Sequence, residues 1–392
     1  MRRPFVFAAR LLSSLFQPIS PMCCFAAAVA LVSVVTGPAI AVETSGLQDV
    51  DPPAKHPVLQ PFDVAEKKLP ANLFLVRTRG ELPKPAAVTV HGSHNGVFLV
   101  SGKPAKVHEL AKKGCAVLSI RDLPTPPPSR VRRWLPVASP DPDIADMVGQ
   151  VNWEQVRAKI QWLVDFGTRY SFAPNHRTVA ESLHDAFVSY GLQTNFRPFK
   201  YMGAQMWTVE ATQIGSKYPN SYVIICGHFD SLSELPMNSA PGADDNATGT
   251  AAVLTAAEIL SQHTFDYSIR YICFAGEEQG LVGSYFYATE ALMENTDIVG
   301  VLNFDMLGFW RTGVDKDLEI ETNNASIWLA EAVINAAELY TGTPYELHVY
   351  DWAWWGDHFW FWLRGYSAVN HEEAWDWGDP DFNPYYHTAR DL

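Results

Sequence analysis

The strongest constraint on the fold is an alternation that runs from about residue 147 to the C-terminus. Short apolar runs typical of strands alternate there with segments whose apolar residues recur at helical spacing. The predicted strands are 206–214, 222–226, 269–274, 298–304 and 367–370. The predicted helices include 178–190, which has capping-box spacing at Thr178 and Glu181, and 247–260, 281–292, 327–339 and 358–364. This alternation predicts an α/β fold with a mostly parallel central sheet and helices on both faces.

The first residues of the chain have the pattern of an export signal. Arginines at positions 2, 3 and 10 precede an apolar run at 25–35 and a small-x-small site at 39–41. We therefore predict a signal peptide over residues 1–41 and a secreted or periplasmic protein. An uncleaved N-terminal anchor is the alternative. No later segment reaches the length of a transmembrane helix, so no stable membrane span is expected after signal cleavage.

Two further parts precede the larger α/β domain, which we place at 147–392. Residues 42–122 are predicted to hold a linker and a small α/β module, with strand-like runs near 73–78, 96–101 and 115–120. A propeptide or intramolecular chaperone and a plain accessory domain explain this module equally well. A proline-dense stretch then predicts a linker over 123–146, because it cannot hold a helix or a central strand.

Composition excludes some classes of partner. The chain is 47% hydrophobic, which is enough for a full globular core. Its net charge of −14 argues against nucleic acid, because phosphate binding needs a basic face. Cys115, Cys226 and Cys273 follow the predicted signal and are too few for a dense disulfide framework. Cys226 and Cys273 are expected to be buried thiols, with one disulfide between them as the alternative.

Side chains that can bind metal ions follow the predicted strands or precede a helix. They are His228, Asp230, Asp244, Asp245, Glu277, Glu278 and Asp305. Because ligands of open α/β sheets bind at the carboxyl ends of the strands, we expect these side chains to converge. Unpaired carboxylates gathered at one place would repel one another, so a bound cation is expected among them.

The types of ligand favour zinc. Imidazole with carboxylates suits Zn²⁺, with Co²⁺ or Mn²⁺ as alternatives, whereas calcium prefers more oxygen ligands. One histidine with several carboxylates suits two metals that share a carboxylate, provided that a second histidine comes from later in the chain. His387 lies in a suitable C-terminal loop, and His348, His358 and His371 compete with it.

Five motifs occur in order along residues 147–392. They are His228-Phe229-Asp230-Ser231, Pro241-Gly242-Ala243-Asp244-Asp245-Asn246-Ala247-Thr248-Gly249, Phe274-Ala275-Gly276-Glu277-Glu278-Gln279-Gly280-Leu281-Val282-Gly283-Ser284, Asn303-Phe304-Asp305-Met306-Leu307-Gly308 and Tyr386-His387-Thr388. Together they resemble the co-catalytic zinc aminopeptidase family that includes the secreted bacterial and fungal leucyl aminopeptidases. Glutamate carboxypeptidase, glutaminyl cyclase and the transferrin receptor are more distant relatives of that family.

The resemblance implies a zinc exopeptidase-like fold with a site for two Zn²⁺ ions. The ligands that it assigns are His228, Asp244, Glu278, Asp305 and His387. His228 and Asp305 would bind one zinc, Glu278 and His387 would bind the other, and Asp244 would bridge both. The peptide between Asp244 and Asp245 resembles one that the family holds cis.

The resemblance also implies an aminopeptidase that acts on peptides or proteins through a metal-bridged water. Glu277 would be the general base, and Tyr386 would donate to the oxyanion of the tetrahedral intermediate. Asp230 would hydrogen-bond the His228 imidazole. A glutaminyl cyclase or a carboxypeptidase on the same fold, and an inactive binding module, are the alternatives. The tryptophan-rich stretch 350–377 indicates either packing or an aromatic-walled substrate pocket.

Overall fold

The computed structural model describes residues 136–311, 317–350, 355–374 and 379–392, and before them the shorter stretches 70, 72–77, 82–83, 88–94, 97–107, 109–110 and 115–119. The predicted signal peptide and the first part of the predicted linker, 123–135, lie outside the described residues. The later part of that linker is helical at Pro142–Gly149, which corrects the expectation that the stretch cannot hold a helix, because Pro142 stands at the helix start, where a proline is tolerated. Among the helices in these ranges, none is both long enough and apolar enough to cross a membrane.

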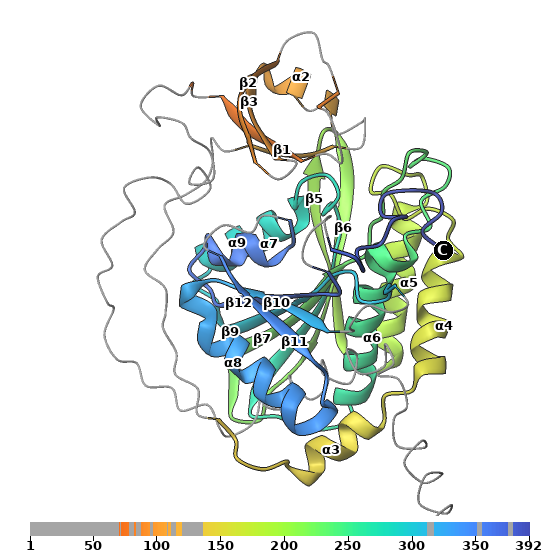
Figure 1. The fold of residues 1–392 in the computed structure, drawn as a ribbon. Helices are drawn as coiled ribbons and strands as arrows, with labels where there is room; N and C mark the ends of the chain where they lie inside the picture. The colour runs from red at the N-terminus through yellow and green to blue at the C-terminus, as the bar shows by residue number, and fades with distance from the viewer. Residues whose placement is uncertain are drawn as a thin grey trace, which may run out of the picture.

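An eight-stranded sheet forms the centre of the molecule, in the order β11-β10-β12-β9-β7-β8-β6-β5 (Figure 1). Its strands are β5 (Gln193–Tyr201), β6 (Ala204–Gln213), β7 (Tyr218–His228), β8 (Tyr267–Phe274), β9 (Asp297–Phe304), β10 (Leu318–Thr322), β11 (Tyr345–Val349) and β12 (Ala368–Glu372). The four central strands β12, β9, β7 and β8 are parallel. The β5–β6 hairpin joins β8 antiparallel, and β10 is antiparallel to β12. The sheet is therefore mixed, with a parallel centre.

Helices cover both faces of this sheet. They are α3 (Pro142–Gly149), α4 (Trp153–Val164), α5 (His176–Ser189), α6 (Gly249–Leu260), α7 (Val282–Met293), α8 (Ile327–Ala336) and α9 (His358–Trp362). Side chains along β7 alternate between two cores, as the pleat of a strand requires. Val223 and Ile225 pack with α5, α6 and α8, whereas Ile224 packs with α7 and α9. The predicted α/β fold class is confirmed.

A separate four-stranded antiparallel sheet forms the N-terminal module (Figure 1). It consists of β1 (Leu73–Arg77), β2 (Val88–His94), β3 (Val97–Gly102) and β4 (Ala116–Ser119), with the short helix α2 (Pro104–Val107). Leu75 of β1 and Leu99 of β3 share a buried cluster with Tyr287 of α7 and Trp360 of α9. The module therefore packs directly on the larger domain.

The cysteines of the described ranges and some of the tryptophans there are core residues. Cys115, Cys226 and Cys273 are buried free thiols, so the alternative of a disulfide between Cys226 and Cys273 is wrong. Trp360 and Trp362 are buried in the cluster that holds α7 and α9. These two support the packing interpretation, while the tryptophans at 352, 354, 375 and 377 lie outside the described residues.

Candidate metal centre

Three neighbouring strands carry candidate ligands at their carboxyl ends. His228 is the last residue of β7, Glu277 and Glu278 follow β8, and Asp305 follows β9. Because β7 pairs in parallel with both β8 and β9, these ends meet at one edge of the sheet. The convergence expected from the sequence is therefore present.

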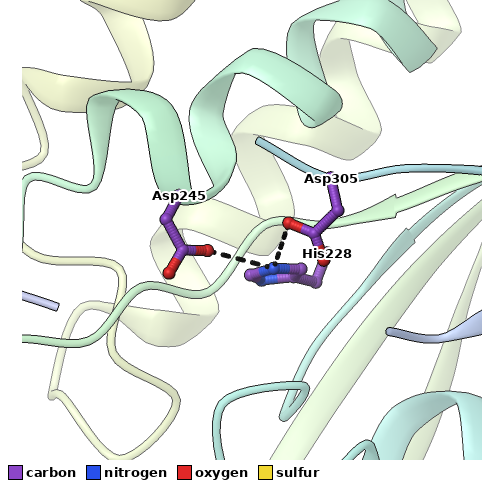
Figure 2. Close-up of side chains that lie close together, drawn as sticks. All are labelled: His228, Asp245 and Asp305. Carbon is purple, nitrogen blue, oxygen red and sulfur yellow. Dashed lines mark hydrogen bonds and ion pairs between the residues drawn. The ribbon is translucent and has the colours of Figure 1, made fainter. Parts of the chain in front are cut away.

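His228, Asp245 and Asp305 form a first buried group (Figure 2). Nε2 of His228 lies 3.3 Å from Oδ1 of Asp245 and 3.2 Å from Oδ1 of Asp305. Nδ1 of His228 lies 3.0 Å from the backbone oxygen of Asp230, so Nε2 is the nitrogen that faces the two carboxylates.

Asp245, Glu278 and His387 form a second group. Nε2 of His387 lies 3.2 Å from Oδ2 of Asp245 and 2.7 Å from Oε2 of Glu278. Asp245 thus belongs to both groups, with one carboxylate oxygen directed at each histidine. A carboxylate shared between two sets of ligands is the arrangement that holds a pair of metal ions.

The expectation that Asp244 is the shared ligand is corrected by this geometry. Oδ1 of Asp244 accepts a hydrogen bond from the amide of Gly308 at 2.9 Å, and its Oδ2 accepts one from Asn383 at 2.9 Å. Asp245 has an extended conformation (φ −102°, ψ 94°). Because successive side chains of an extended backbone point to opposite sides, the side chains of Asp244 and Asp245 point in different directions. The cis peptide is likewise one residue later than expected, between Asp245 and Asn246.

Asp230 contacts both His228 and the turn that carries the two glutamates. The imidazole of His228 hydrogen-bonds the backbone oxygen of Asp230, and Oδ1 of the Asp230 carboxylate is 3.6 Å from Nδ1 of the same imidazole. That buried carboxylate accepts hydrogen bonds from the amides of Glu277 at 3.2 Å and Glu278 at 3.3 Å. Asp230 therefore links the end of β7 to the turn that carries both glutamates.

Glu277 and Tyr386 lie beside the two groups. Oε2 of Glu277 is 3.9 Å from Nε2 of His228, and the side chain is 12% exposed, more than its neighbours in the first group. The ring of Tyr386 stacks on that of His387 with 3.7 Å between centroids. Both residues are placed next to the candidate ligands, and their catalytic roles stay predictions.

The electrostatics of the two groups favour a bound cation. Burial raises the pKa of Glu278 to about 7 and that of Glu277 well above its ordinary value. Burial would lower the pKa of His387, but Glu278 and Asp245 outweigh it and raise that pKa to about 9. Burial opposes a high pKa at His228 too, yet Asp305 and Glu277 hold it well above the ordinary range. The carboxylates thus draw protons onto the histidines, and a divalent metal supplies the same positive charge by displacing those protons.

The donor set also fits zinc. Each group offers one imidazole with two carboxylates, which are ligands that zinc accepts. Oε1 of Glu278 is buried and has no hydrogen-bond partner. A buried acceptor of this kind is costly unless something pairs with it, and a metal ion bound by Glu278 would do so.

The competing histidines lie elsewhere. Nδ1 of His371 is 2.7 Å from the backbone oxygen of Asn303, and His358 packs against Trp362. His348 pairs closely with Glu319 on the neighbouring strand. With Glu346 these two meet the distance requirement of a metal site, but Glu346 is largely exposed and the Glu319–His348 ion pair already accounts for the contact.

Arg169 is a supporting residue that sequence reasoning missed. It is fully buried and donates to the backbone oxygens of Phe229 at 2.7 Å and Gly242 at 2.7 Å, and also to that of Pro241. Burial lowers the pKa of its guanidinium to about 10. Arg169 therefore joins the loop after His228 to the loop before Asp245, and a single arginine between helices gives no sequence signal for that contact.

Comparison with known proteins agrees with this geometry. Residues 208–392 match the family model for peptidase family M28. A probable zinc metalloprotease of Pyrenophora tritici-repentis is 31% identical over 193 residues, which are 43% of this chain and 44% of the relative. One of Pyricularia oryzae is 30% identical over 205 residues, which are 47% and 41% of the two chains. The chain thus spans less than half the length of these curated relatives.

Solved structures show the likeness of fold. The Legionella pneumophila LapA aminopeptidase has a TM-score of 0.64 at 18% identity, covering 82% of this chain and 91% of its own. LapB of the same organism has a TM-score of 0.61 at 17% identity, covering 82% and 92%. Together with the family match, these findings confirm the family resemblance noted in the sequence.

Proposed function

Because residues 208–392 match the family model for peptidase family M28, we propose that this chain is a zinc-dependent exopeptidase that removes N-terminal residues from peptides. One observation carries the proposal. The carboxylate of Asp245 lies between two histidine–carboxylate groups, with Glu277 beside them. This arrangement supports a site for two metal ions with Glu277 as the general base.

Each zinc ion would have its own ligands and share Asp245. His228 and Asp305 would hold one ion, and Glu278 and His387 would hold the other. Zinc bound there supplies Lewis-acid chemistry, since it polarises a carbonyl group and makes water more acidic.

Two residues of the chain would move or hold protons. The Glu277 carboxylate would accept the proton of the attacking water and pass it to the leaving amine. Burial raises the pKa of Glu277 well above its ordinary value, which brings the carboxylate closer to the basicity that this transfer needs. The Tyr386 hydroxyl would donate a hydrogen bond to the oxyanion of the tetrahedral intermediate.

The charge around the site favours a free amino end over a free carboxyl end. The candidate ligands are rich in carboxylates, which attract an ammonium group. The buried cation beside them, Arg169, is committed to backbone oxygens. Arg270 donates to Tyr287 at 2.8 Å and Arg364 donates to Thr289 at 2.8 Å, so both have partners of their own. A carboxypeptidase would need a cation that is available to the substrate carboxylate.

Hydrolysis of aminoacyl p-nitroanilides by zinc-loaded protein tests this function. The panel includes the N-acetylated form of each substrate and an N-blocked dipeptide with a free carboxyl end. We expect release from the free aminoacyl substrates only, abolished by a chelator. Glu277→Gln should lower kcat by at least ~100-fold, the usual contribution of a general base. The control Glu294→Gln, an exposed residue after α7, should keep full activity.

Other outcomes point elsewhere. Cleavage of the N-blocked dipeptide from its carboxyl end would replace the aminopeptidase with a carboxypeptidase. No cleavage by folded protein that carries two zinc ions would sink the proposed exopeptidase activity on small peptides.

We also propose a secreted or periplasmic location, on the basis of the basic start, apolar run and small-x-small site at the N-terminus. N-terminal sequencing of the protein from the medium or periplasm of an expressing host would test it. A mature chain beginning at residue 42 supports the proposal, and full-length protein retained in the cytoplasm contradicts it.

A further inference from the structure

The C-terminal segment of the chain hydrogen-bonds the loop that carries Asp245, the carboxylate shared by the two groups. Oδ1 of Asp391 accepts a hydrogen bond from the amide of Asp244 at 3.1 Å, and its Oδ2 accepts one from the amide of Asp245 at 3.1 Å. The backbone oxygen of Asp391 accepts a third bond, from the amide of Ala243 at 3.1 Å. Asp391 is buried, with 4% of its surface exposed. Three consecutive amides of the loop are thus held by one residue.

We propose that Asp391 is a positioning residue of the metal centre, whose carboxylate fixes the backbone at Asp244 and Asp245 so that Asp245 presents one oxygen to each histidine. The inference rests on the proposed function, because it assigns a role within the same site. Asp391 itself acts through Asp245, and its carboxylate is occupied by the two amides.

The same C-terminal segment carries His387, so it positions both that histidine and the loop of Asp245. Asn383 donates to Oδ2 of Asp244 at 2.9 Å and to Oδ1 of Asp391 at 3.2 Å. His387 lies between Asn383 and Asp391 in the chain. A shift of this segment would therefore move the histidine of the second group and release the loop of the shared carboxylate at the same time.

The chemistry of the contact calls for a carboxylate. Two backbone N–H donors and the side-chain amide of Asn383 face the side chain of Asp391, and a carboxylate offers two acceptor oxygens to them. An asparagine of the same shape has one acceptor oxygen, and its NH₂ group would face an N–H donor. Such a buried donor without an acceptor is costly, so the loop is expected to move away from it. Burial and Asp244 raise the pKa of Asp391 to about 7, while the two amides favour its ionised form.

Metal binding by the Asp391→Asn variant tests the proposal, since it is measured without any substrate. Zinc affinity is determined by chelator competition, and the ligand geometry by visible absorption of the Co²⁺-loaded protein. We expect zinc affinity to fall ~10–100-fold, the usual cost of losing a residue that orients a ligand, with a changed Co²⁺ spectrum. In active protein kcat should fall while KM changes little. Asp185→Asn makes the same chemical change at an exposed position of α5 and should leave all of these unchanged.

The outcomes separate this inference from the proposed function. If wild-type protein binds two metal ions but cleaves no substrate, the proposed activity fails and the metal measurements still decide the role of Asp391. Unchanged zinc affinity and an unchanged Co²⁺ spectrum in folded Asp391→Asn would overturn that role. If this variant does not fold, Asp391→Ala removes both acceptor oxygens without placing an NH₂ donor against the loop amides. Zinc affinity equal to wild type in folded Asp391→Ala would also overturn the proposal, and wild-type protein that binds fewer than two ions would overturn both.

Discussion

Two adjacent aspartates have different tasks in this centre, and the difference lies in where each side chain points. Asp245 faces His228 and His387, whereas Asp244 faces the amide of Gly308 and the side chain of Asn383. Direct coordination and support of a neighbouring ligand differ in what their loss costs, so substitution can tell them apart.

Asp245→Asn should therefore lose metal and activity far more severely than Asp244→Asn. The amide at position 245 keeps the shape of the side chain but removes the charge shared by the two groups. At position 244 the expected loss of affinity stays within the ~10–100-fold typical of supporting residues. Metal content by mass spectrometry and kcat on an aminoacyl p-nitroanilide measure both. Equal losses, or a larger loss at Asp244, would restore Asp244 as the shared ligand.

The titrating groups of the metal-free centre make its stability depend on pH. The folded-state pKa of Glu278 is raised by burial from 4.5 to about 7, and that of His387 is raised from 6.5 to about 9 by Glu278 and Asp245 against the effect of burial. In both cases the folded protein binds more protons than the unfolded chain, so stability is lost as pH rises through each interval. Metal-free protein should lose stability steadily between pH 4.5 and pH 9.

Zinc should reverse this trend, because it binds the deprotonated ligands. The rise in unfolding temperature on adding zinc is therefore expected to grow from pH 6 to pH 9, and thermal denaturation with and without zinc measures it. A rise that is constant over this range would show that no proton is displaced from the centre.

At the scale of elements, the sequence predicted the buried strands well and the edge strands poorly. β7, β8 and β9 each contain a mostly apolar, buried run, because both faces of the sheet are covered there. β5 alternates exposed and half-buried residues and contains Pro198, and β10 and β11 are short, so these strands were missed. Each lies at or next to an edge of the sheet, where the apolar signal is weak.

One helix start was also misplaced, for a tertiary reason. The capping-box spacing at Thr178 and Glu181 predicted a later start, but α5 begins at His176. The His176 ring is buried, and its Nε2 accepts a hydrogen bond from the amide of Trp207 on β6. This contact with the sheet holds the first turn in place, and it joins residues 31 positions apart.

The candidate site also has a part that the sequence pattern predicts and a part that it does not. The strand ends that carry His228, Glu278 and Asp305 follow from the pattern of apolar runs, because the carboxyl ends of parallel strands meet at one edge. The direction of Asp245 depends on the local φ and ψ of a loop. Asp391 contacts that loop across 146 and 147 positions of sequence, which no local pattern encodes.

At the scale of the whole molecule, the N-terminal module touches the turn that carries the candidate general base. Gly280 follows Glu277 and Glu278 in that turn and has a left-handed φ of +106°. A Cβ added there would lie 2.3 Å from the backbone oxygen of Val117, in β4 of the module. The turn and the module therefore fit together only because residue 280 has no side chain.

Gly280→Ala should accordingly disturb both the module and the turn. Gly342→Ala is the matched control, because Gly342 also has a left-handed φ, of +64°, but no atom lies within 4 Å of its added Cβ. We expect the control to lose about 1 kcal/mol from backbone conformation alone. Gly280→Ala should lose about 2 kcal/mol more, because a backbone atom of Val117 must also move. Urea denaturation measures both changes, and limited proteolysis reports whether the module loosens. If the two variants lose equal stability and the module resists protease in both, then β4 does not pack tightly against the turn, and the module does not constrain the position of Glu277.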